Sequence, residues 1–314
     1  MSEFNYPLLL KPVAVPRPWG GGRLCNLYDR ECIKSNQPIG ESWDVSTWPT
    51  DPGNPELATV TVIQNGPLAG MPLDKLIDIP VVIKLLDSAE KLSVQVHPVS
   101  DNTHKDEMWY VLHADPDAYL FCGFAEGVTP EYFCQLVQAE NADEEAVLKC
   151  LHTETKLIPG QYFNVPSGTI HAVGPGLVAF EVSECMQVTY RLYDYNRGRA
   201  LHIDDGCKAL KANRNVGPLL NPGVEIEGKV DIDLITQFPT FTVTKVSGGC
   251  FRVTNCEHKH LITATMSDCK ISGPTDDWNL VLKQSYTCVV PAGSIGYNID
   301  PGDGREVLIT SLCC

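Results

Sequence analysis

Short apolar segments separated by turn residues follow one another along almost the whole chain. Many of them are bounded by Gly, Pro or Asp, and Val, Ile, Tyr and Phe are frequent within them. Segments of this kind favour strands, and many short strands with turns between them are typical of β-sandwiches and barrels. The sequence therefore predicts a mainly β protein. Examples of the segments are VVIKLLD, LSVQVHP, MWYVLHA, GLVAFEV and TCVVP.

One small helical insertion is predicted within this series, over about 129–151. Thr129 followed by Pro130 is a typical helix cap and first-turn pair, and apolar residues then recur at helical spacing. A second short helix is expected over 143–151, because acidic residues occupy its first turn, where the helix dipole favours them. The stretch 204–210 predicts a third helix.

The chain contains one internal repeat. The segment VPSGTIH, which ends at His171, aligns with VPAGSIG, which ends at Gly296, and each copy lies between two predicted strands. Two copies of one β unit indicate two related domains. We predict a metal-binding catalytic domain over 1–235 and a C-terminal β-rich domain over 236–314, which lacks the ligands because Gly296 replaces His171.

Charge and cysteine content limit the classes of function. The chain has 39 acidic and 24 basic residues, a net charge of −15, which disfavours a nucleic-acid partner. No apolar run is long enough to span a membrane, and the N-terminus lacks the pattern of a secretory signal, so we expect a cytoplasmic protein. The 13 cysteines include no CxxC pair. We therefore expect reduced thiols rather than a disulfide framework or a cysteine-built zinc site.

A set of polar residues on predicted strands has the composition of a metal site. Ser93, Gln95 and His97 alternate along one segment, so their side chains face the same side. Glu107 begins the next predicted strand, and His171 follows a later turn. Two imidazoles and a carboxylate with one open position form a catalytic zinc arrangement, although iron, manganese or cobalt would also suit them. Taken singly, each residue is more often structural or solvated, and only the joint pattern favours a metal.

These motifs resemble the cupin superfamily. Gly160-x5-Pro166-x-Gly168-x2-His171 matches its second signature, and Gln95-x-His97 with Glu107 resembles the first. The first signature departs from that of many cupins in two ways: Gln95 stands in place of a His, and the gap from His97 to Glu107 is longer. In both features the sequence resembles the short bacterial form of type I mannose-6-phosphate isomerase. The resemblance covers about 1–210 and implies cupin or jelly-roll β-sandwich domains. Further matches are Trp19-Gly20-Gly21, Glu41-Ser42-Trp43, Phe121-Cys122-Gly123-Phe124, Lys105-Asp106-Glu107-Met108, Glu181 and Val188 to Asp194.

The resemblance also implies roles for individual residues. One Zn²⁺ ion per chain would be bound by Gln95, His97, Glu107 and His171. Arg191 would be the active-site arginine, and Arg197 would hold the substrate phosphate together with Lys105. Lys105 and Glu181 are further catalytic candidates, and Ser93 and Trp19 are assigned to the substrate site. The general base stays open between Glu181, Lys105 and a metal-bound hydroxide.

The implied activity is the interconversion of mannose 6-phosphate and fructose 6-phosphate through an enediolate. Two alternatives stay open, which are a cupin isomerase of another sugar phosphate and a non-enzymatic carbohydrate-binding or regulatory cupin. A sugar phosphate is the expected partner, without a membrane or nucleic acid, for a monomer or homodimer. One competing pattern, His258-x-His260, has the alternation of metal ligands, but its polar surroundings favour a surface loop.

Overall fold

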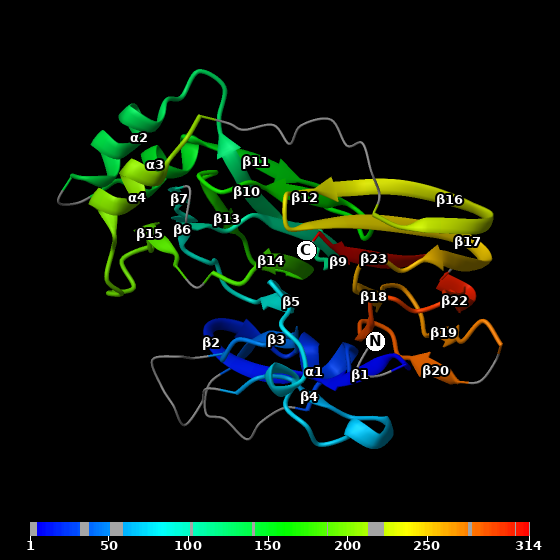
Figure 1. Ribbon diagram of the computed structural model, residues 1–314. Helices are drawn as coiled ribbons and strands as arrows, with labels where there is room; N and C mark the ends of the chain where they lie inside the picture. Colours follow the sequence, from blue (N-terminus) through cyan, green and yellow to red (C-terminus); the bar gives the residue numbers. More distant parts are fainter. Residues whose placement is uncertain are drawn as a thin grey trace.

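The computed structural model describes residues 5–31, 38–50, 59–100, 103–139, 142–186, 188–212, 223–275, 278–304 and 306–313. Strands dominate these residues and the helices are few and short, so the prediction of a mainly β fold is confirmed (Figure 1). None of the described helices combines the length and the apolar character needed to cross a lipid bilayer.

Two antiparallel sheets form a sandwich around the first copy of the repeat. Their facing sides share an apolar cluster that contains Trp109 and Leu86 from one sheet and Leu120 and Val173 from the other. The six-stranded sheet has the order β12 (Tyr162–Val165), β9 (Glu107–Ala114), β14 (Leu177–Glu184), β5 (Val81–Ser88), β3 (Ile39–Val45), β2 (Val13–Gly21). The five-stranded sheet has the order β11 (Leu151–Thr155), β10 (Tyr119–Phe124), β13 (His171–Val173), β6 (Val94–Val96), β15 (Tyr190–Tyr193).

A ten-stranded sheet contains the second copy of the repeat. Most of its strands come from the C-terminal part of the chain, but the N-terminal strands β1 and β4 extend it, because β1 pairs with β21. Its order is β20 (Asn279–Leu282), β19 (Cys269–Ser272), β22 (Tyr297–Asp300), β17 (Phe241–Asn255), β23 (Glu306–Leu312), β18 (His260–Ala264), β21 (Thr287–Val290), β1 (Leu8–Lys11), β4 (Val62–Ile63), with β16 (Glu225–Gln237) paired to β17. A separate pair joins β7 (Val99–Ser100) and β8 (Thr103–His104).

The predicted division of the chain at 235/236 falls inside β16, which is one continuous strand paired along its length with β17. A cut there would break a hydrogen-bonded ladder. A single apolar cluster also joins the sandwich to the ten-stranded sheet, with Tyr110 and Phe180 on one side and Phe241 and Leu308 on the other. The division into two domains and the position of its boundary therefore stay predictions.

The two copies of the repeat have the same local structure. Each runs from a strand through a tight turn into the next strand, β12 to β13 in the first copy and β21 to β22 in the second. The turn glycines adopt the left-handed conformation at the matching position, with φ of 85° at Gly168 and 75° at Gly293. Only glycine occupies this region without steric strain, which explains why the Pro-x-Gly pattern recurs.

The three predicted helices are present, and they gather at one end of the molecule (Figure 1). Thr129 caps α2, since its hydroxyl oxygen accepts a hydrogen bond from the backbone N–H of Tyr132 at 3.3 Å. Asp143 caps α3 in the same way, through the N–H of Ala146 at 2.8 Å. The helices are α1 (Arg23–Leu27), α2 (Pro130–Val137), α3 (Glu144–Lys149) and α4 (Ile203–Ala209), with 3₁₀ turns at Gly66–Leu68, Leu73–Lys75 and Gly302–Gly304.

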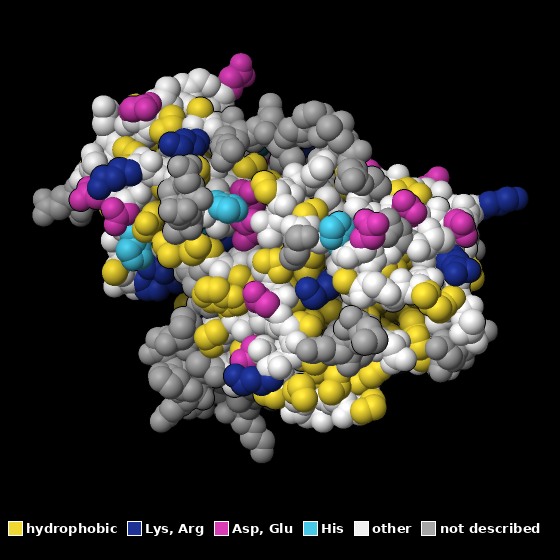
Figure 2. All heavy atoms as spheres, viewed as in Figure 1, with side chains coloured by type: hydrophobic (Ala, Val, Ile, Leu, Met, Phe, Trp, Pro, Cys, Tyr) yellow, Lys and Arg dark blue, Asp and Glu magenta, His cyan; other side chains and the backbone are white. Residues whose placement is uncertain are grey.

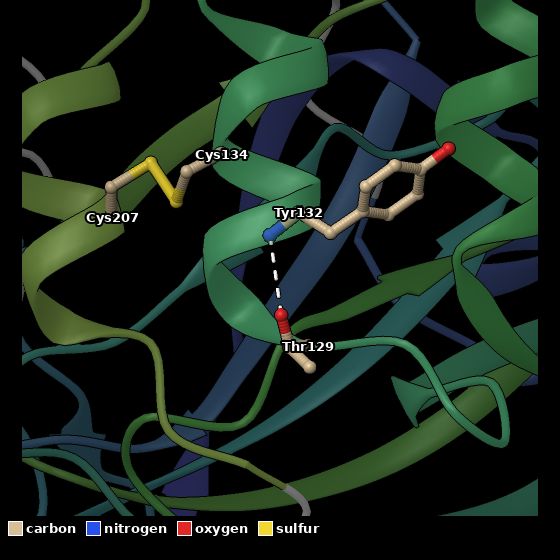
Figure 3. The surroundings of a disulfide bond; sticks show 4 residues. All are labelled: Thr129, Tyr132, Cys134 and Cys207. Atoms are coloured by element: carbon tan, nitrogen blue, oxygen red, sulfur yellow. Dashed lines mark hydrogen bonds between the residues drawn. A yellow bond between two sulfur atoms is a disulfide. The ribbon is translucent and has the colours of Figure 1, made fainter.

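A disulfide bond joins α2 to α4 through Cys134 and Cys207 (Figure 3). The expectation that all the cysteines are reduced is therefore wrong for this pair, and Cys25 is disulfide-bonded as well. The two bridged residues are 73 positions apart in sequence. The spacing of cysteines along the sequence does not predict a bridge of this kind, because the bridge depends on the packing of two helices against each other.

Basic side chains do not form a band on the face of the molecule seen in Figure 2. Lys and Arg lie scattered among acidic and apolar side chains there. This distribution agrees with the net charge of −15. The coloured side chains on this face therefore offer no extended basic surface to an anion.

Candidate metal centre and substrate pocket

Strand register in the five-stranded sheet sets three predicted site residues side by side. Gln95 on β6 lies opposite His171 on β13 and opposite Arg191 on β15. Directly opposed residues on neighbouring strands project to the same face of a sheet. The register therefore places a predicted ligand and the predicted active-site arginine on either side of Gln95, on the face toward the interior of the sandwich.

Three of the four predicted metal ligands come together in one cluster. The ligand atoms of His97, Glu107 and His171 all lie within 4.8 Å of one another, and all three side chains are buried. Nε2 of His97 is 3.0 Å from one carboxylate oxygen of Glu107, and Nε2 of His171 is 4.0 Å from the other. Because His171 belongs to one sheet, His97 directly follows β6 of that sheet and Glu107 belongs to the facing one, the cluster bridges the sandwich.

The hydrogen bonds of the two imidazoles suit a metal ligand. Nδ1 of His97 lies 3.1 Å from the carbonyl oxygen of Val188, and Nδ1 of His171 lies 2.8 Å from that of Thr169. In the tautomer that donates these bonds, both Nε2 atoms present a lone pair toward Glu107. Nε2 of His97 is buried, and among the described residues its 3.0 Å contact with Glu107 does not have the geometry of a hydrogen bond. A divalent cation would satisfy this atom.

Gln95, the fourth predicted ligand, borders the cluster. Its Nε2 atom is 3.2 Å from Nε2 of His171, and Ser93 donates a hydrogen bond to its Oε1 atom at 3.3 Å. Rotation of the amide by half a turn exchanges these two atoms, and it would bring the oxygen to the histidine side. The side chain is thus placed to complete the ligand set, although its oxygen points to Ser93 in this conformation.

Electrostatics favour the metal-binding protonation states of Glu107 and His171. Burial alone would raise the pKa of Glu107, but Lys105, whose Nζ is 2.7 Å from the carboxylate, and His97 lower it well below its usual range. Burial and the neighbouring His97 lower the pKa of His171 to about 3. An ionised carboxylate and a neutral imidazole are the forms that coordinate a divalent ion.

A pocket with a volume of about 270 Å³ opens beside this cluster, and both faces of the sandwich line it. The structure places seven of the predicted site residues on its wall, namely Trp19, Ser93, Gln95, Lys105, Glu107, Glu181 and Arg191. Lys105 projects to the same side as Glu107, as its position two residues earlier predicts. The wall also includes Arg17, Glu41, Trp43, Trp48, Lys84, Glu184 and Arg199.

Arg197 lies outside this wall. Its guanidinium is bound to the side chain and backbone carbonyl of Asp194 and to the carbonyl of Lys91, and it stacks over Tyr195. Arg199 lines the pocket instead, and it forms an ion pair with the same Asp194. The sequence places both arginines two residues apart, so only the turn at 194–199 decides which of them faces the pocket.

Lys84 is a pocket residue that the sequence motifs missed. It lies opposite Glu181 in the register of β5 and β14, and its Nζ is 3.0 Å from the carboxylate. Burial would lower the pKa of Lys84, but Glu181 and Glu41 raise it, so the lysine stays protonated. The signal was present in the segment VVIKLLD, where Lys84 stands between apolar residues in a strand that is buried along its whole length.

Glu41 and its partners form the outer part of the same wall. Arg17 and the indole N–H of Trp43 both donate to one carboxylate oxygen of Glu41, each at 2.8 Å. Burial opposes ionisation, yet Arg17, Lys84 and these hydrogen bonds lower the pKa of Glu41 to about 2. The pocket wall therefore contains two ion pairs between adjacent strands, Arg17 with Glu41 and Lys84 with Glu181.

The interpretation of His258-x-His260 as a surface loop is wrong for its second member. His260 lies on β18 with no exposed surface, and its Nδ1 atom is 2.8 Å from the hydroxyl of Tyr297. Burial lowers the pKa of His260 to about 4, so the ring is neutral in the core of the ten-stranded sheet. Among the residues that the structure describes, it joins no cluster of metal-binding side chains.

Comparison with known proteins gives consistent relatives, although no family model matches the chain. A probable mannose-6-phosphate isomerase of Bacillus subtilis, GmuF, is 32% identical over 268 residues, which are 77% of this chain and 79% of the relative. A mannose-6-phosphate isomerase of Streptococcus mutans is 31% identical over 275 residues, 77% of this chain and 80% of the relative.

Solved structures show the same fold over nearly the whole chain. The crystal structure of the mannose 6-phosphate isomerase from Bacillus subtilis superimposes with a TM-score of 0.79 at 24% identity, and covers 97% of this chain and 99% of that one. The enzyme from Salmonella typhimurium, bound to its substrate f6p and to zinc, gives a TM-score of 0.72 at 16% identity, with 98% and 100% covered.

Proposed function

The chain belongs to the mannose-6-phosphate isomerase family, and we propose that its pocket interconverts mannose 6-phosphate and fructose 6-phosphate. The observation that carries the proposal is the conjunction of the His97, Glu107 and His171 cluster with an acid–base pair and two arginines in one pocket. A binding protein would need neither the buried Lys84–Glu181 pair nor a free coordination position. The conjunction therefore favours an enzyme over a carbohydrate-binding cupin.

We assign the cofactor as one Zn²⁺ ion, held by His97, Glu107, His171 and Gln95. The relative crystallised with zinc supports this choice over iron, manganese or cobalt. When bound, a divalent zinc ion supplies a Lewis acid that polarises sugar oxygens. A phosphorylated sugar as substrate supports a cytoplasmic location, and we propose a monomer or homodimer.

The isomerisation moves a proton between C2 and C1 of the open-chain sugar. Of the open candidates for the base we favour Glu181, because its carboxylate lines the pocket and is largely buried beside Lys84. Protonated Lys84 holds this carboxylate in one orientation and can donate a hydrogen bond to a reacting oxygen. Lys105 is less suitable, since its ammonium is paired with the ligand Glu107.

Two arginines divide the negative charges of the substrate. Arg191 lies opposite Gln95, next to the metal ligands, and its Nε atom is buried without a hydrogen-bond partner among the described residues. We assign it to the oxyanion that develops during enolisation. Arg199 lines the pocket with about a third of its side chain exposed, and we move to it the phosphate-binding role that the sequence suggested for Arg197.

A coupled assay tests the proposed reaction. Fructose 6-phosphate formed from mannose 6-phosphate is measured before chelation, after chelation and after zinc is added back. We expect activity that disappears with the chelator and returns with zinc. Turnover of another sugar phosphate alone would replace the substrate assignment, and a zinc-loaded protein without turnover of any sugar phosphate would contradict the enzyme.

A further inference from the structure

The Cys134–Cys207 disulfide lies at one end of a chain of contacts that leads to the pocket. Cys134 is on α2 in the helical insertion, and Cys207 is on α4, which follows β15 in the sequence (Figure 3). Neither cysteine lines the substrate pocket, and neither belongs to the cluster of His97, Glu107 and His171. The bridge therefore contributes no chemistry to the reaction, but it fixes where α4 lies.

The helix α4 packs directly on the strand that carries Arg191. At Gly206, next to Cys207, an added Cβ would come within 2.5 Å of the side chain of Leu192 and 3.2 Å of that of Tyr190. A close approach of this kind leaves no room for α4 to shift toward the strand. On its other side the disulfide ties the helix to α2, so α4 is held between two neighbours.

The segment that enters α4 makes three hydrogen bonds with Arg191. The backbone N–H of Arg191 donates to Nδ1 of His202 at 3.1 Å, and its carbonyl accepts from the N–H of His202 at 2.8 Å. Its guanidinium donates to the carbonyl of Ala200 at 2.7 Å. His202 is the residue immediately before α4, so any displacement of the helix is transmitted to both the backbone and the side chain of Arg191.

We propose that the Cys134–Cys207 disulfide is a redox-sensitive strut that positions Arg191 through α4, so that reduction of the bridge weakens turnover of the sugar phosphate. Cys134 and Cys207 are thus positioning residues. The inference rests on the proposed function, because it assigns Arg191 to the reaction. It extends that function by coupling the active site to the thiol redox state of the surroundings.

The bridge is open to a dithiol reductant. Both cysteines line a groove of about 590 Å³ on the surface, between α2 and α4. In the exchange, one thiolate of the dithiol attacks a sulfur of the bridge, which forms a mixed disulfide and releases the other cysteine as a thiolate. The second thiolate of the dithiol then attacks the dithiol's own sulfur in the mixed disulfide and releases the remaining cysteine thiolate. The S–S bond of the protein breaks and takes up two electrons and two protons, while the dithiol is oxidised to its own disulfide.

The experiment compares the zinc-loaded wild type, the same protein reduced with dithiothreitol, and the double variant C134S/C207S. The double variant is needed because reduction also opens the bridge of Cys25. The exposed free thiol Cys250, changed to serine, is the matched control. Mass spectrometry after alkylation without reductant first counts the thiols. The readouts are kcat and KM for mannose 6-phosphate, zinc content and hydrogen exchange of the backbone amides.

We expect kcat/KM to fall about fivefold or more in the reduced and the double-variant proteins, within the range of ordinary coupling between sites. Amides of Tyr190–Tyr193 and of 199–202 should exchange faster, while those of β5 and the zinc content stay as in the wild type. Reoxidation should restore the wild type and leave C134S/C207S unchanged. C250S should match the wild type in every readout.

Three outcomes would contradict the proposal that the Cys134–Cys207 disulfide positions Arg191. Cys134 and Cys207 could both be alkylated without reductant, the double variant could keep wild-type kinetics and exchange, or its faster exchange could extend through β5, as in general destabilisation. A protein that turns over no sugar phosphate would refute the proposed function separately. The exchange pattern at Tyr190–Tyr193 would then decide by itself whether the bridge holds this strand.

Discussion

The two copies of the β repeat share a scaffold but differ in what fills their interior. In the first copy the strand after the turn begins with His171, and the space around it is lined by ionisable groups. In the second copy Gly296 stands at that position, and the core is closed by Ile262, Ile299 and Cys288, none of which has exposed surface. A polar interior costs stability unless every group is paired.

The difference shows how one unit keeps a site and the other supports it. In the first unit several charges have an oppositely charged partner on a neighbouring strand, such as Lys84 with Glu181 and Arg17 with Glu41. In the second unit a buried histidine, His260, contacts the hydroxyl of Tyr297 rather than a charged group, and burial keeps it neutral. The first unit is therefore built for chemistry, and the second packs against it through the shared apolar cluster.

The largest effect is expected from a comparison of His171 in the first copy of the repeat with His260 in the second unit. We expect His171→Ala to lose zinc and to reduce kcat/KM by about 100-fold or more, because a ligand matters at least as much as the groups that orient it. His260→Ala should lower the free energy of unfolding by about 1 to 3 kcal/mol, since it leaves the Tyr297 hydroxyl unpaired, while zinc content is kept. Metal analysis, kinetics and urea unfolding measure these quantities. Loss of zinc in both variants would contradict the assignment of His171, and not His260, as a metal ligand.

A smaller effect is expected at the acid–base pair of the first unit. Glu181→Gln keeps the size of the side chain and removes its ability to accept a proton. We expect kcat to fall by about 10²- to 10⁴-fold, with zinc content unchanged, because general base catalysis contributes on that scale. Steady-state kinetics on the zinc-loaded variant measure it. The matched control is Glu154→Gln on the outer strand β11, which should behave as the wild type; equal kcat values in the two variants would remove Glu181 as the base.

The smallest effect should distinguish two neighbouring arginines. We expect Arg199→Ala to raise KM for mannose 6-phosphate by about tenfold, with a minor change in kcat, because uniform binding of the phosphate is lost in ground and transition states alike. Arg197→Ala should leave KM within about twofold, since its guanidinium is bound to Asp194 and a backbone carbonyl outside the pocket. A larger increase in KM for Arg197→Ala than for Arg199→Ala would instead assign phosphate binding to Arg197.

The sequence determined much of this protein because local patterns and spacing encode it. Alternating polar residues predicted the strand that contains Gln95, the cap at Thr129 predicted its helix, and the Pro-x-Gly turn predicted the position of His171. These features depend on residues close together in the chain. The three clustered ligands followed from them, since the cupin-like spacing leaves few arrangements of the strands.

Tertiary structure alone decided the remaining features, because they depend on contacts between distant segments. The Lys84–Glu181 pair spans 97 positions and the Cys134–Cys207 bridge spans 73. The pairing of β1 with β21 brings an N-terminal strand into the C-terminal sheet, and no local pattern contains that partner. The conformation of the turn after Asp194 likewise determines that Arg199, and not Arg197, lines the pocket. Strand register and helix packing fix such choices, and both are properties of the assembled chain.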